Sequence, residues 1–390
     1  MSVRRVIAVL GLVAVLLSGC ERATVHDGDD PQPLGPAWQS LTLPAPPGAP
    51  GRLLVRDAVA CGGRWYVVGG VEDAAGDTRP AAWTSADGLS WRGVPIRADS
   101  FYGRQNVLFS VGCRDGVAAV IGAKVGGAHG YPRVSTWGPL PDGGLVEVQA
   151  PFETYGGPKA VNVSRLAGGS AGWLIVGNRS SGAAAWVSSD AAEFTLIEGA
   201  PELASDGAGV SWAFDAVAGP EGWLAVGGVL PPGRIDRDAA VWASSDGRSW
   251  RRTVVPGSRE YEELQRVAVV NGVPVAVGLR GGVFGAWRRE SSGWVAAGDF
   301  GRRAASGVPA VTALVAAGGR LVAAVTDGER YAVWESADRG GSWRPVVLPV
   351  AVAAGADRDV ASVAVGDRWW LAADDGERGG LWWASVPAGS

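Results

Sequence analysis

The sequence predicts an all-β protein folded as a seven-bladed β-propeller of four-stranded antiparallel blades. Three observations lead to this prediction. One phrase, a turn followed by an apolar run, recurs seven times along the 390 residues. Each repeat divides into short apolar runs bounded by Gly, Asp and Asn turns, with hardly any helical periodicity. The last repeat lacks its fourth run, and a matching run stands near the start of the chain. Four-strand repeats of this length are typical of propellers.

The recurring phrase marks the second strand of each blade. Its copies end near positions 69, 122, 177, 227, 278, 326 and 373, which lie about 50 residues apart, within the range of propeller repeats. The copies are Gly62–Gly70, Arg114–Gly122, Ser170–Asn178, Pro220–Gly228, Asn271–Leu279, Gly318–Thr326 and Gly366–Asp374.

The other three strands are placed around this phrase. A short apolar run, such as "RDAVAC", precedes each copy and predicts the first strand. After a loop of variable length comes a run that ends in tryptophan, which predicts the third strand. In most repeats a further run opens on an aromatic residue, as in "SWRGVPI", and predicts the fourth. The third-strand tryptophans are Trp83, Trp137, Trp186, Trp242, Trp287, Trp334 and Trp383.

The start of the chain supplies the strand that the seventh repeat lacks. "AWQSLTLPAP", at residues 37–46, has the same shape as "SWRPVVLPV", the fourth run of the sixth repeat. We therefore expect Trp38–Leu43 to complete the seventh blade as its outer strand and to close the ring. A linear array of repeats would instead need polar capping repeats at its two ends.

The turn before the fourth strand carries a motif. "SADRGGSW", Ser336–Trp343, resembles the Asp-box, or bacterial neuraminidase repeat, Ser-x-Asp-x-Gly-x-Thr-Trp, and two further copies are one residue shorter. The resemblance implies a hairpin in which Asp accepts hydrogen bonds from turn amides, Gly takes a positive φ and Trp packs under the neighbouring hairpin. We assign these aspartates a structural role rather than a catalytic or metal-binding one. The residues concerned are Ser85, Asp87, Trp91, Asp190, Ser244, Asp246, Trp250, Ser336, Asp338, Gly340 and Trp343.

The N-terminus indicates export and lipid anchoring. Residues 1–19 combine two arginines with an apolar run too short to span a membrane comfortably, as a signal peptide does. "LSGC" resembles the bacterial lipobox, which implies a lipidated Cys20. Residues 20–36 are predicted to be a flexible tether and residues 37–390 the propeller. We expect the protein at the extracytoplasmic face of a bacterial cell membrane. An ordinary signal peptide with a chance cysteine is the alternative, and the export route, Sec or twin-arginine, stays open.

Two further cysteines remain after Cys20. Cys61 and Cys113 stand at matching places in successive repeats, and disulfides persist outside the cytoplasm. A disulfide between neighbouring blades is therefore predicted. The alternative is a pair of free thiols whose backbones lie too far apart to be joined.

Composition argues against several classes of function. The formal net charge is −4, so no large basic field for nucleic acid is indicated. Histidine occurs only as His26 and His129, which leaves little room for a histidine triad or a multi-histidine metal site. No glycine-rich phosphate loop follows a strand and opens a helix. We expect no cofactor, no metal and a monomer.

One segment offers a catalytic alternative. "SREYEEL" places Arg259, Tyr261 and Glu262 together in a blade-joining loop. Sialidases, in which Asp-boxes are best known, use a Tyr nucleophile assisted by Glu, three arginines and an Asp acid. The early Arg-Ile-Pro phrase of that family is absent. A solvated turn is the other interpretation, and proximity in sequence says little about convergent geometry.

The favoured function is binding. Loops on a rigid scaffold often carry function, and Tyr and Arg anchor interfaces. Hence we predict a membrane-anchored, non-enzymatic binding or scaffold module for a protein or glycan partner, with a diverged sialidase-like glycoside hydrolase as the alternative. The candidate binding residues, from long second-to-third-strand loops and blade-joining segments, are Tyr102, Arg104, Tyr131, Arg133, Tyr155, Arg234 and Arg237.

Overall fold

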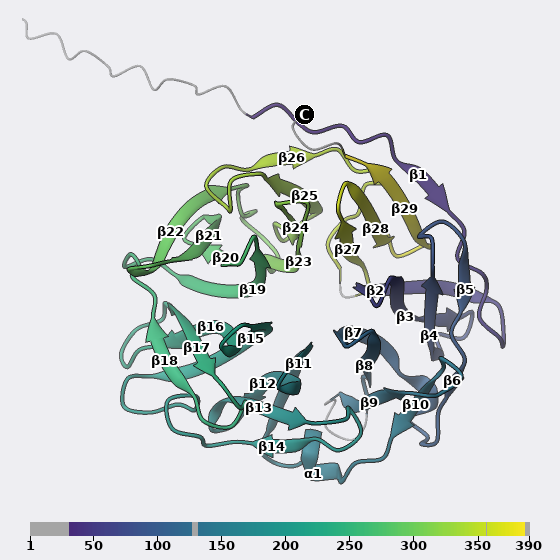
Figure 1. Ribbon diagram of the computed structural model, residues 1–390, viewed down its shortest axis with the longest axis horizontal. Helices are drawn as coiled ribbons and strands as arrows, with labels where there is room; N and C mark the ends of the chain where they lie inside the picture. The colour runs from purple at the N-terminus through teal and green to yellow at the C-terminus, as the bar shows by residue number, and fades with distance from the viewer. Residues whose placement is uncertain (1–30, 127–131, 356, 387–390) are drawn as a thin grey trace, which may run out of the picture.

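The computed structural model describes residues 31–126, 132–355 and 357–386, and it is a ring of seven antiparallel blades (Figure 1). The centre of the ring, where side chains such as Arg165 and Asp57 meet, is here called the channel. Six sheets have four strands each. The sheet of the second blade gains a fifth, because the short β6 (Ile96–Arg97) from the preceding blade-joining segment pairs in parallel with β10 (Leu145–Val148). The predicted fold class is confirmed. Among the described residues, no helix has the length and apolarity that a membrane crossing needs.

The strands follow one another from the channel outward in every blade. Blades one to three comprise β2 (Gly51–Cys61), β3 (Arg64–Asp73), β4 (Thr78–Ser85) and β5 (Trp91–Gly93); β7 (Val107–Arg114), β8 (Val117–Lys124), β9 (Arg133–Pro139) and β10; and β11 (Ala160–Gly169), β12 (Gly172–Arg179), β13 (Gly182–Ser188) and β14 (Thr195–Ile197). Two short helices, η1 (Gly103–Gln105) and α1 (Phe152–Tyr155), lie in the segments that enter the second and third blades.

Blades four to seven repeat this order. They comprise β15 (Val210–Gly219), β16 (Gly222–Leu230), β17 (Asp238–Ser244) and β18 (Arg251–Val254); β19 (Glu262–Val270), β20 (Val273–Arg280), β21 (Val283–Glu290) and β22 (Gly293–Phe300); β23 (Ala310–Ala317), β24 (Arg320–Thr326), β25 (Tyr331–Ser336) and β26 (Arg344–Val346); and β27 (Asp359–Val365), β28 (Arg368–Asp374), β29 (Gly379–Ser385) and β1 (Gln39–Leu41).

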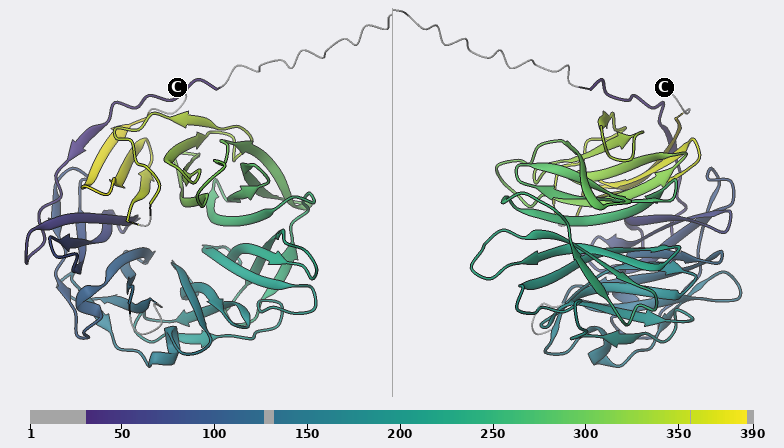
Figure 2. Two further views of the ribbon diagram at one scale, coloured as in Figure 1. Left: turned by 180° about the vertical axis from the view of Figure 1, so that it is seen from behind. Right: turned by 60° about the vertical axis from the view of Figure 1, so that its left-hand side comes forward.

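The up-and-down order of the strands gives the ring two different faces (Figure 2). The turns between first and second strands and between third and fourth strands, such as 62–63 and 86–90, lie on one face, here called the hairpin face. The loops between second and third strands and the blade-joining segments, such as 74–77 and 98–106, lie on the other, here called the loop face.

The two ends of the propeller meet in the seventh blade. β1 pairs antiparallel with β29, Gln39 opposite Trp383 and Leu41 opposite Leu381, so the predicted closing strand is confirmed. The contacts begin earlier than this strand. Leu34, inside the predicted tether, bridges Val346 of β26, and its amide donates to the carbonyl of Pro345 at 2.8 Å. Ordered packing against the ring therefore starts before Ala37.

The core consists of seven hydrophobic clusters, one between each pair of neighbouring blades. Each blade thus buries both of its faces, which explains why the strand interiors read as nearly continuous apolar runs. The third-strand tryptophans of the first five blades are fully buried at the centre of this packing: Trp83, Trp137, Trp186, Trp242 and Trp287. A linear stack would leave one apolar sheet surface exposed to water at each end, whereas the closed ring leaves none exposed.

Four of these tryptophans also fix the loop face. Each indole Nε1–H donates to the segment that enters its own blade: Trp83 to the carbonyl of Pro44, Trp137 to Oδ1 of Asn106, Trp186 to the carbonyl of Thr154 and Trp242 to the carbonyl of Glu202. A buried indole seeks such a partner. The repeated tryptophan therefore positions the loops in addition to filling the core.

The Ser–Asp turns on the hairpin face are hydrogen-bonded staples. Oδ1 of Asp87 accepts from the amides of Leu89 and Ser90 at 2.8 and 2.7 Å, and Oγ of Ser85 accepts from the amide of Gly88. The same pattern of bonds surrounds Asp190 and Asp246, and a closely similar one surrounds Asp338. By accepting these hydrogen bonds, the four aspartates stabilise the turns between third and fourth strands.

Each such turn also packs on the preceding blade. Gly88 has φ +74°, and a Cβ on it would lie 2.3 Å from Trp370 of the seventh blade. The indole Nε1–H of Trp370 donates to the carbonyl of Gly88 at 2.7 Å. Cys61 and Cys113, at the ends of β2 and β7, are joined by a disulfide on the same face, with Cα atoms 5.5 Å apart. Packing, hydrogen bonds and a disulfide thus hold the turns of the hairpin face against the neighbouring blades.

Candidate binding surface

The predicted binding residues divide into two groups on the loop face. Tyr102, Arg133 and Tyr155 lie where the second and third blades meet. Arg104 lies in η1, which contacts β4 and β8 of the first and second blades. Arg234 and Arg237 belong to the second-to-third-strand loop of the fourth blade. Tyr131 lies outside the described residues. Cys20 and the signal peptide are likewise outside them.

Exposed apolar side chains gather on the same face. Eight of the eleven large hydrophobic residues that are exposed among the described residues stand in its loops or at the strand ends beside them. They are Phe101, Val125, Phe152, Val161, Val210, Ile235, Val308 and Val347. Contiguous exposed apolar surface marks interaction sites more often than single residues do.

The first group surrounds an arginine held between aromatic rings. The guanidinium carbon of Arg133 lies 4.7 Å from the ring centroid of Phe152 and 5.5 Å from that of Tyr102. The two rings come from different blade-joining segments, while Arg133 begins β9. A groove of about 240 Å³ opens here, and we call it the arginine groove. Its lining includes Tyr102, Arg133, Glu147, Pro151, Phe152 and Tyr155.

Glu147 holds the wall of this groove in place. Its carboxylate is 5% exposed and accepts from the amides of Asp99 and Ser100 and from the hydroxyls of Ser100 and Ser135, at 2.6 to 2.9 Å. Burial alone would raise the pKa of Glu147, but these hydrogen bonds bring it below its ordinary value. The carboxylate is therefore occupied, and it orders the segment that presents Phe101 and Tyr102.

An apolar pocket lies beside the arginine groove. It has a volume of about 240 Å³ and shares Pro132, Val134 and Tyr155 with the groove. The rest of its lining is Phe109, Ala123, Val125, Ala160, Val161, Asn162 and Val163. We call the hollow lined by all ten residues the apolar pocket. The amide of Asn162 is already bonded to Ser164 and Asn178. The pocket thus presents aliphatic and aromatic surface.

The second group forms a closed polar network between the fourth and fifth blades. The hydroxyl of Tyr261 donates to Oε2 of Glu263 at 2.6 Å, and Nη1 of Arg237 lies 2.7 Å from the same oxygen. Gln265 donates to the other carboxylate oxygen, and the guanidinium of Arg237 lies over the ring of Trp212 at 5.1 Å. Arg234 is paired with Asp238 instead.

The structure does not bring together the catalytic alternative of Arg259, Tyr261 and Glu262. The carboxylate of Glu262 accepts from Ser258 and faces Arg280 at 3.4 Å, so Glu263, not Glu262, contacts Tyr261. No contact joins Arg259 to Tyr261 among the described residues. Burial, and next the charge of Glu263, raise the pKa of Tyr261 above its ordinary value, which opposes formation of a nucleophilic phenolate.

The central channel holds a network of arginines and aspartates. Arg165, on β11, reaches across the ring to Asp57 of β2 at 2.9 Å and to the carbonyl of Thr312 on β23 at 2.8 Å. Arg266 donates to the same carbonyl. Desolvation raises the pKa of Asp359, at the mouth of the channel, to about 6, even though Arg56 and Arg165 act in the opposite direction. These contacts tie distant blades together.

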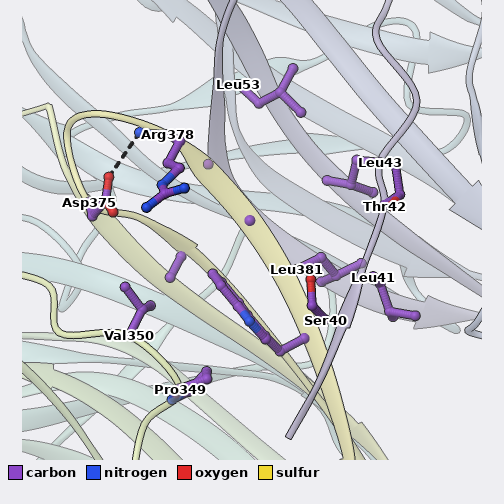
Figure 3. Close-up of a pocket in the computed structure, with 14 residues that line it drawn as sticks. Ser40, Leu41, Thr42, Leu43, Leu53, Pro349, Val350, Asp375, Arg378 and Leu381 are labelled. Atoms are coloured by element: carbon purple, nitrogen blue, oxygen red, sulfur yellow. Dashed lines mark hydrogen bonds between the residues drawn. The ribbon is translucent and has the colours of Figure 1, made fainter.

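A further cleft lies beside the closing strand, with a volume of about 490 Å³ (Figure 3). β29 begins there with Gly379 and Gly380, where a Cβ would lie 2.1 Å from the carbonyl oxygen of Leu53 and 2.4 Å from the ring of Trp382, respectively. The amide of Arg378 donates to the carboxylate of Asp375 at 2.8 Å (Figure 3). The cleft is lined by residues of both β1 and β29. No group of three residues suited to hold a metal occurs in the described part of the chain.

Sequence reasoning missed four residues of these sites. Phe101 and Phe152 stand in the same blade-joining segments as Tyr102 and Tyr155, and a search that weighed every aromatic residue in those segments would have found them. Glu147 and Glu263 lie on strands, and nothing in their local sequence indicates which neighbours they contact.

Comparisons with known proteins identify the fold. No protein-family model matches this chain, and no curated protein matches its sequence. Puromycin hydrolase is similar in structure with a TM-score of 0.51 at 16% identity over 88% of this chain, and this chain spans only about half (53%) of that enzyme's length. The β-propeller domain of the Trilobed protease from Pyrococcus furiosus has a TM-score of 0.50 at 9% identity, covering 87% of this chain and 96% of that one. That domain has an open velcro topology, whereas β1 closes the ring here.

Proposed function

We propose that the protein is a lipid-anchored, extracytoplasmic propeller whose loop face binds a partner without catalysis. The observation that carries this proposal is the guanidinium of Arg133, flanked by the rings of Tyr102 and Phe152 and without an ion pair among the described residues. An arginine on aromatic rings in a groove, beside exposed apolar side chains, has the composition of an interface centre.

The second group of loop residues supports binding over hydrolysis. Both oxygens of Glu263 are occupied by Tyr261, Arg237 and Gln265, and the side chain of Glu263 is buried. A general base for Tyr261 would have to take up the phenol proton, but the raised pKa of Tyr261 makes this transfer unfavourable. Within the described residues, the segment around Tyr261 supplies no assembled acid, base and nucleophile for the glycosidase interpretation.

The proposed anchor restricts where the partner lies. Lipidation of Cys20 would hold the ring by the segment that leads to Leu34, which reaches at most roughly 50 Å when fully extended. Leu34 bridges Val346, the last residue of β26, at the outer edge of the sixth blade. Under this proposal the ring is therefore held by its outer edge, near the membrane surface.

Site-specific photo-crosslinking in the intact cell envelope tests the binding surface. Benzoylphenylalanine in place of Phe101, which is 65% exposed on the loop face, is expected to give a discrete adduct. The matched control replaces Leu89, which is 42% exposed on the hairpin face, and is expected to give none. Equal adducts from both positions, or none from Phe101, would overturn the proposal.

Fractionation tests the anchor. The Cys20→Ser variant is expected to leave the membrane fraction and to lose labelling by a fatty-acid precursor, while wild type retains both. Retention of the variant in the membrane fraction would show that something other than a lipid at Cys20 holds the protein there.

A further inference from the structure

We propose that the arginine groove and the apolar pocket together bind an extended peptide segment of a partner protein, with a carboxylate on Arg133 and a neighbouring apolar side chain in the pocket. This inference rests on the proposed function and names the chemistry of the partner at the same site. Three features lead to it: a guanidinium without an ion pair among the described residues, an apolar hollow beside it, and walls that are ordered in advance.

The guanidinium of Arg133 has no counterion among the described residues. It makes no hydrogen bond or ion pair with any of them, and its Nε is buried without a partner there. The nearby Glu147 is saturated by loop amides and hydroxyls. Aromatic contacts use the faces of a guanidinium, whereas a carboxylate binds the planar N–H edge, so the rings of Tyr102 and Phe152 leave the anion-binding edge compatible with a ligand.

The apolar pocket decides between a peptide and a sugar. A sugar ring carries hydroxyls on most of its carbons and needs polar partners in the wall. The polar side chains of the pocket lining are Asn162 and Tyr155. The side-chain amide of Asn162 is bonded to Ser164 and Asn178, and the hydroxyl of Tyr155 donates to Oγ1 of Thr136 at 3.4 Å. An aliphatic or aromatic side chain matches a pocket walled by Phe109, Val134 and Val163. Because this pocket adjoins the groove of Arg133, the matching ligand is an acidic residue or terminus close to an apolar one.

The walls need little rearrangement to bind. Glu147 holds the loop at residues 99–100, and the side-chain amide of Asn106 donates to the carbonyl of Tyr102 at 2.9 Å. On the other side, Trp186 donates to the carbonyl of Thr154 within α1, next to Phe152. Binding to a surface ordered in advance loses less entropy, which permits a short peptide to bind measurably.

The test is an affinity selection, read by mass spectrometry, from a pooled library of synthetic random dodecapeptides with free C-termini, on the full chain in detergent micelles. The enriched peptides are expected to share Asp or Glu, or a free C-terminus, next to an apolar residue. Affinity of one synthetic peptide is then measured with wild type, Arg133→Gln and Val161→Asp. Loss of a charge-assisted bond is expected to weaken binding roughly tenfold to a hundredfold in Arg133→Gln. Val161→Asp, which changes a partly exposed wall of the pocket, is also expected to weaken it.

The controls separate folding, charge and the source of the carboxylate. Arg259→Gln removes an arginine elsewhere on the loop face and is expected to bind as wild type does, and all variants are compared by melting temperature. Amidation of the peptide C-terminus and, separately, Glu→Gln in the peptide show whether a terminal or a side-chain carboxylate meets Arg133.

Several results would overturn the inference. These are selected peptides without a carboxylate, equal affinity of Arg133→Gln and wild type, or no enriched peptide at all. Acidic oligosaccharides bound on a glycan array in place of peptides would also overturn it. The crosslinking of Phe101 would still report a loop-face partner in each case, so failure of this inference is distinguishable from failure of the proposed function.

Discussion

The two faces of the ring are built from the same repeats but differ in what their side chains do. On the hairpin face, the residues of the recurring motifs make contacts within the protein. Asp87 accepts hydrogen bonds from turn amides, Gly88 packs on Trp370, and Cys61 forms a disulfide. On the loop face, Arg133 has no ion pair within the described part of the chain, and Phe101 is exposed. The most motif-like residues of this sequence are structural, and the candidate binding residues lie where no motif recurs.

This contrast has a physical cause. A hairpin that must pack on the preceding blade is confined to one geometry, and one geometry selects the same residues in several blades. The loops on the other face connect elements whose positions the strands already determine, so their residues are free to vary. Repetition therefore indicates a packing constraint, and its absence indicates where a specific ligand could be accommodated.

The largest expected effect is on the hairpin face. Replacing both Cys61 and Cys113 by alanine removes a cross-link between residues 52 apart in sequence, which predicts a loss of about 4 kcal/mol in the free energy of unfolding. Urea denaturation of the double variant measures it. The loop face should keep its peptide affinity at low denaturant, and a loss of that affinity in the still-folded variant would contradict the separation of the two faces.

The channel provides the next largest effect, through pH. The pKa of Asp359 is raised to about 6 in the native state. The native state therefore keeps a proton that the unfolded chain releases near pH 4. Because of this difference, Asp359 makes the free energy of unfolding fall as pH rises from 4 to 6. Asp246 on the hairpin face behaves in the opposite way, because hydrogen bonds from backbone amides lower its pKa and its contribution is lost as pH falls below 4. Asp359→Asn is expected to raise stability at pH 7 by at most about 3 kcal/mol. Melting temperatures of wild type and Asp359→Asn from pH 4 to 7 test this prediction. An identical dependence of melting temperature on pH in the two proteins would contradict it.

A matched pair of glycines in the fourth blade isolates packing from backbone strain. Gly247 on the hairpin face and Gly233 on the loop face have φ of +70° and +75°. A Cβ on Gly247 would lie 2.6 Å from Val187, whereas nothing lies within 4 Å of a Cβ on Gly233. Gly233→Ala is expected to cost about 1 kcal/mol, and Gly247→Ala about 1 to 3 kcal/mol more. Equal costs in urea denaturation would show that the hairpin turn is not packed as described.

The smallest expected effect on stability belongs to the loop face. Phe101→Ser removes an aromatic side chain that is 65% exposed, so the unfolding free energy should change by no more than about 0.5 kcal/mol. Affinity for a selected peptide should fall in the same variant. A marked drop in melting temperature would place Phe101 among the structural residues and would remove the contrast between the faces at this point.

Particular residues show how far sequence reasoning reached. The closing strand was predictable because residues 37–46 repeat the aromatic-then-apolar pattern of the other outer strands. In the structure, β1 does pair with β29. The contact of Tyr261 with Glu263 was missed, although successive residues on a strand point to opposite sides, so a residue shares its side with the one two positions on. Applying that rule required knowing that β19 begins at Glu262, a boundary that the blade-joining segment hides.

By itself, the sequence determined the number of blades, the order of strands and the closure of the ring, because each blade must bury both of its faces and this requirement repeats about every 50 residues. Only the tertiary structure decided that Tyr102, Arg133 and Phe152 meet in one groove, with Glu147 ordering its wall. These side chains come from separate segments, and their distances depend on how neighbouring blades lie against each other, which no local pattern of residues specifies.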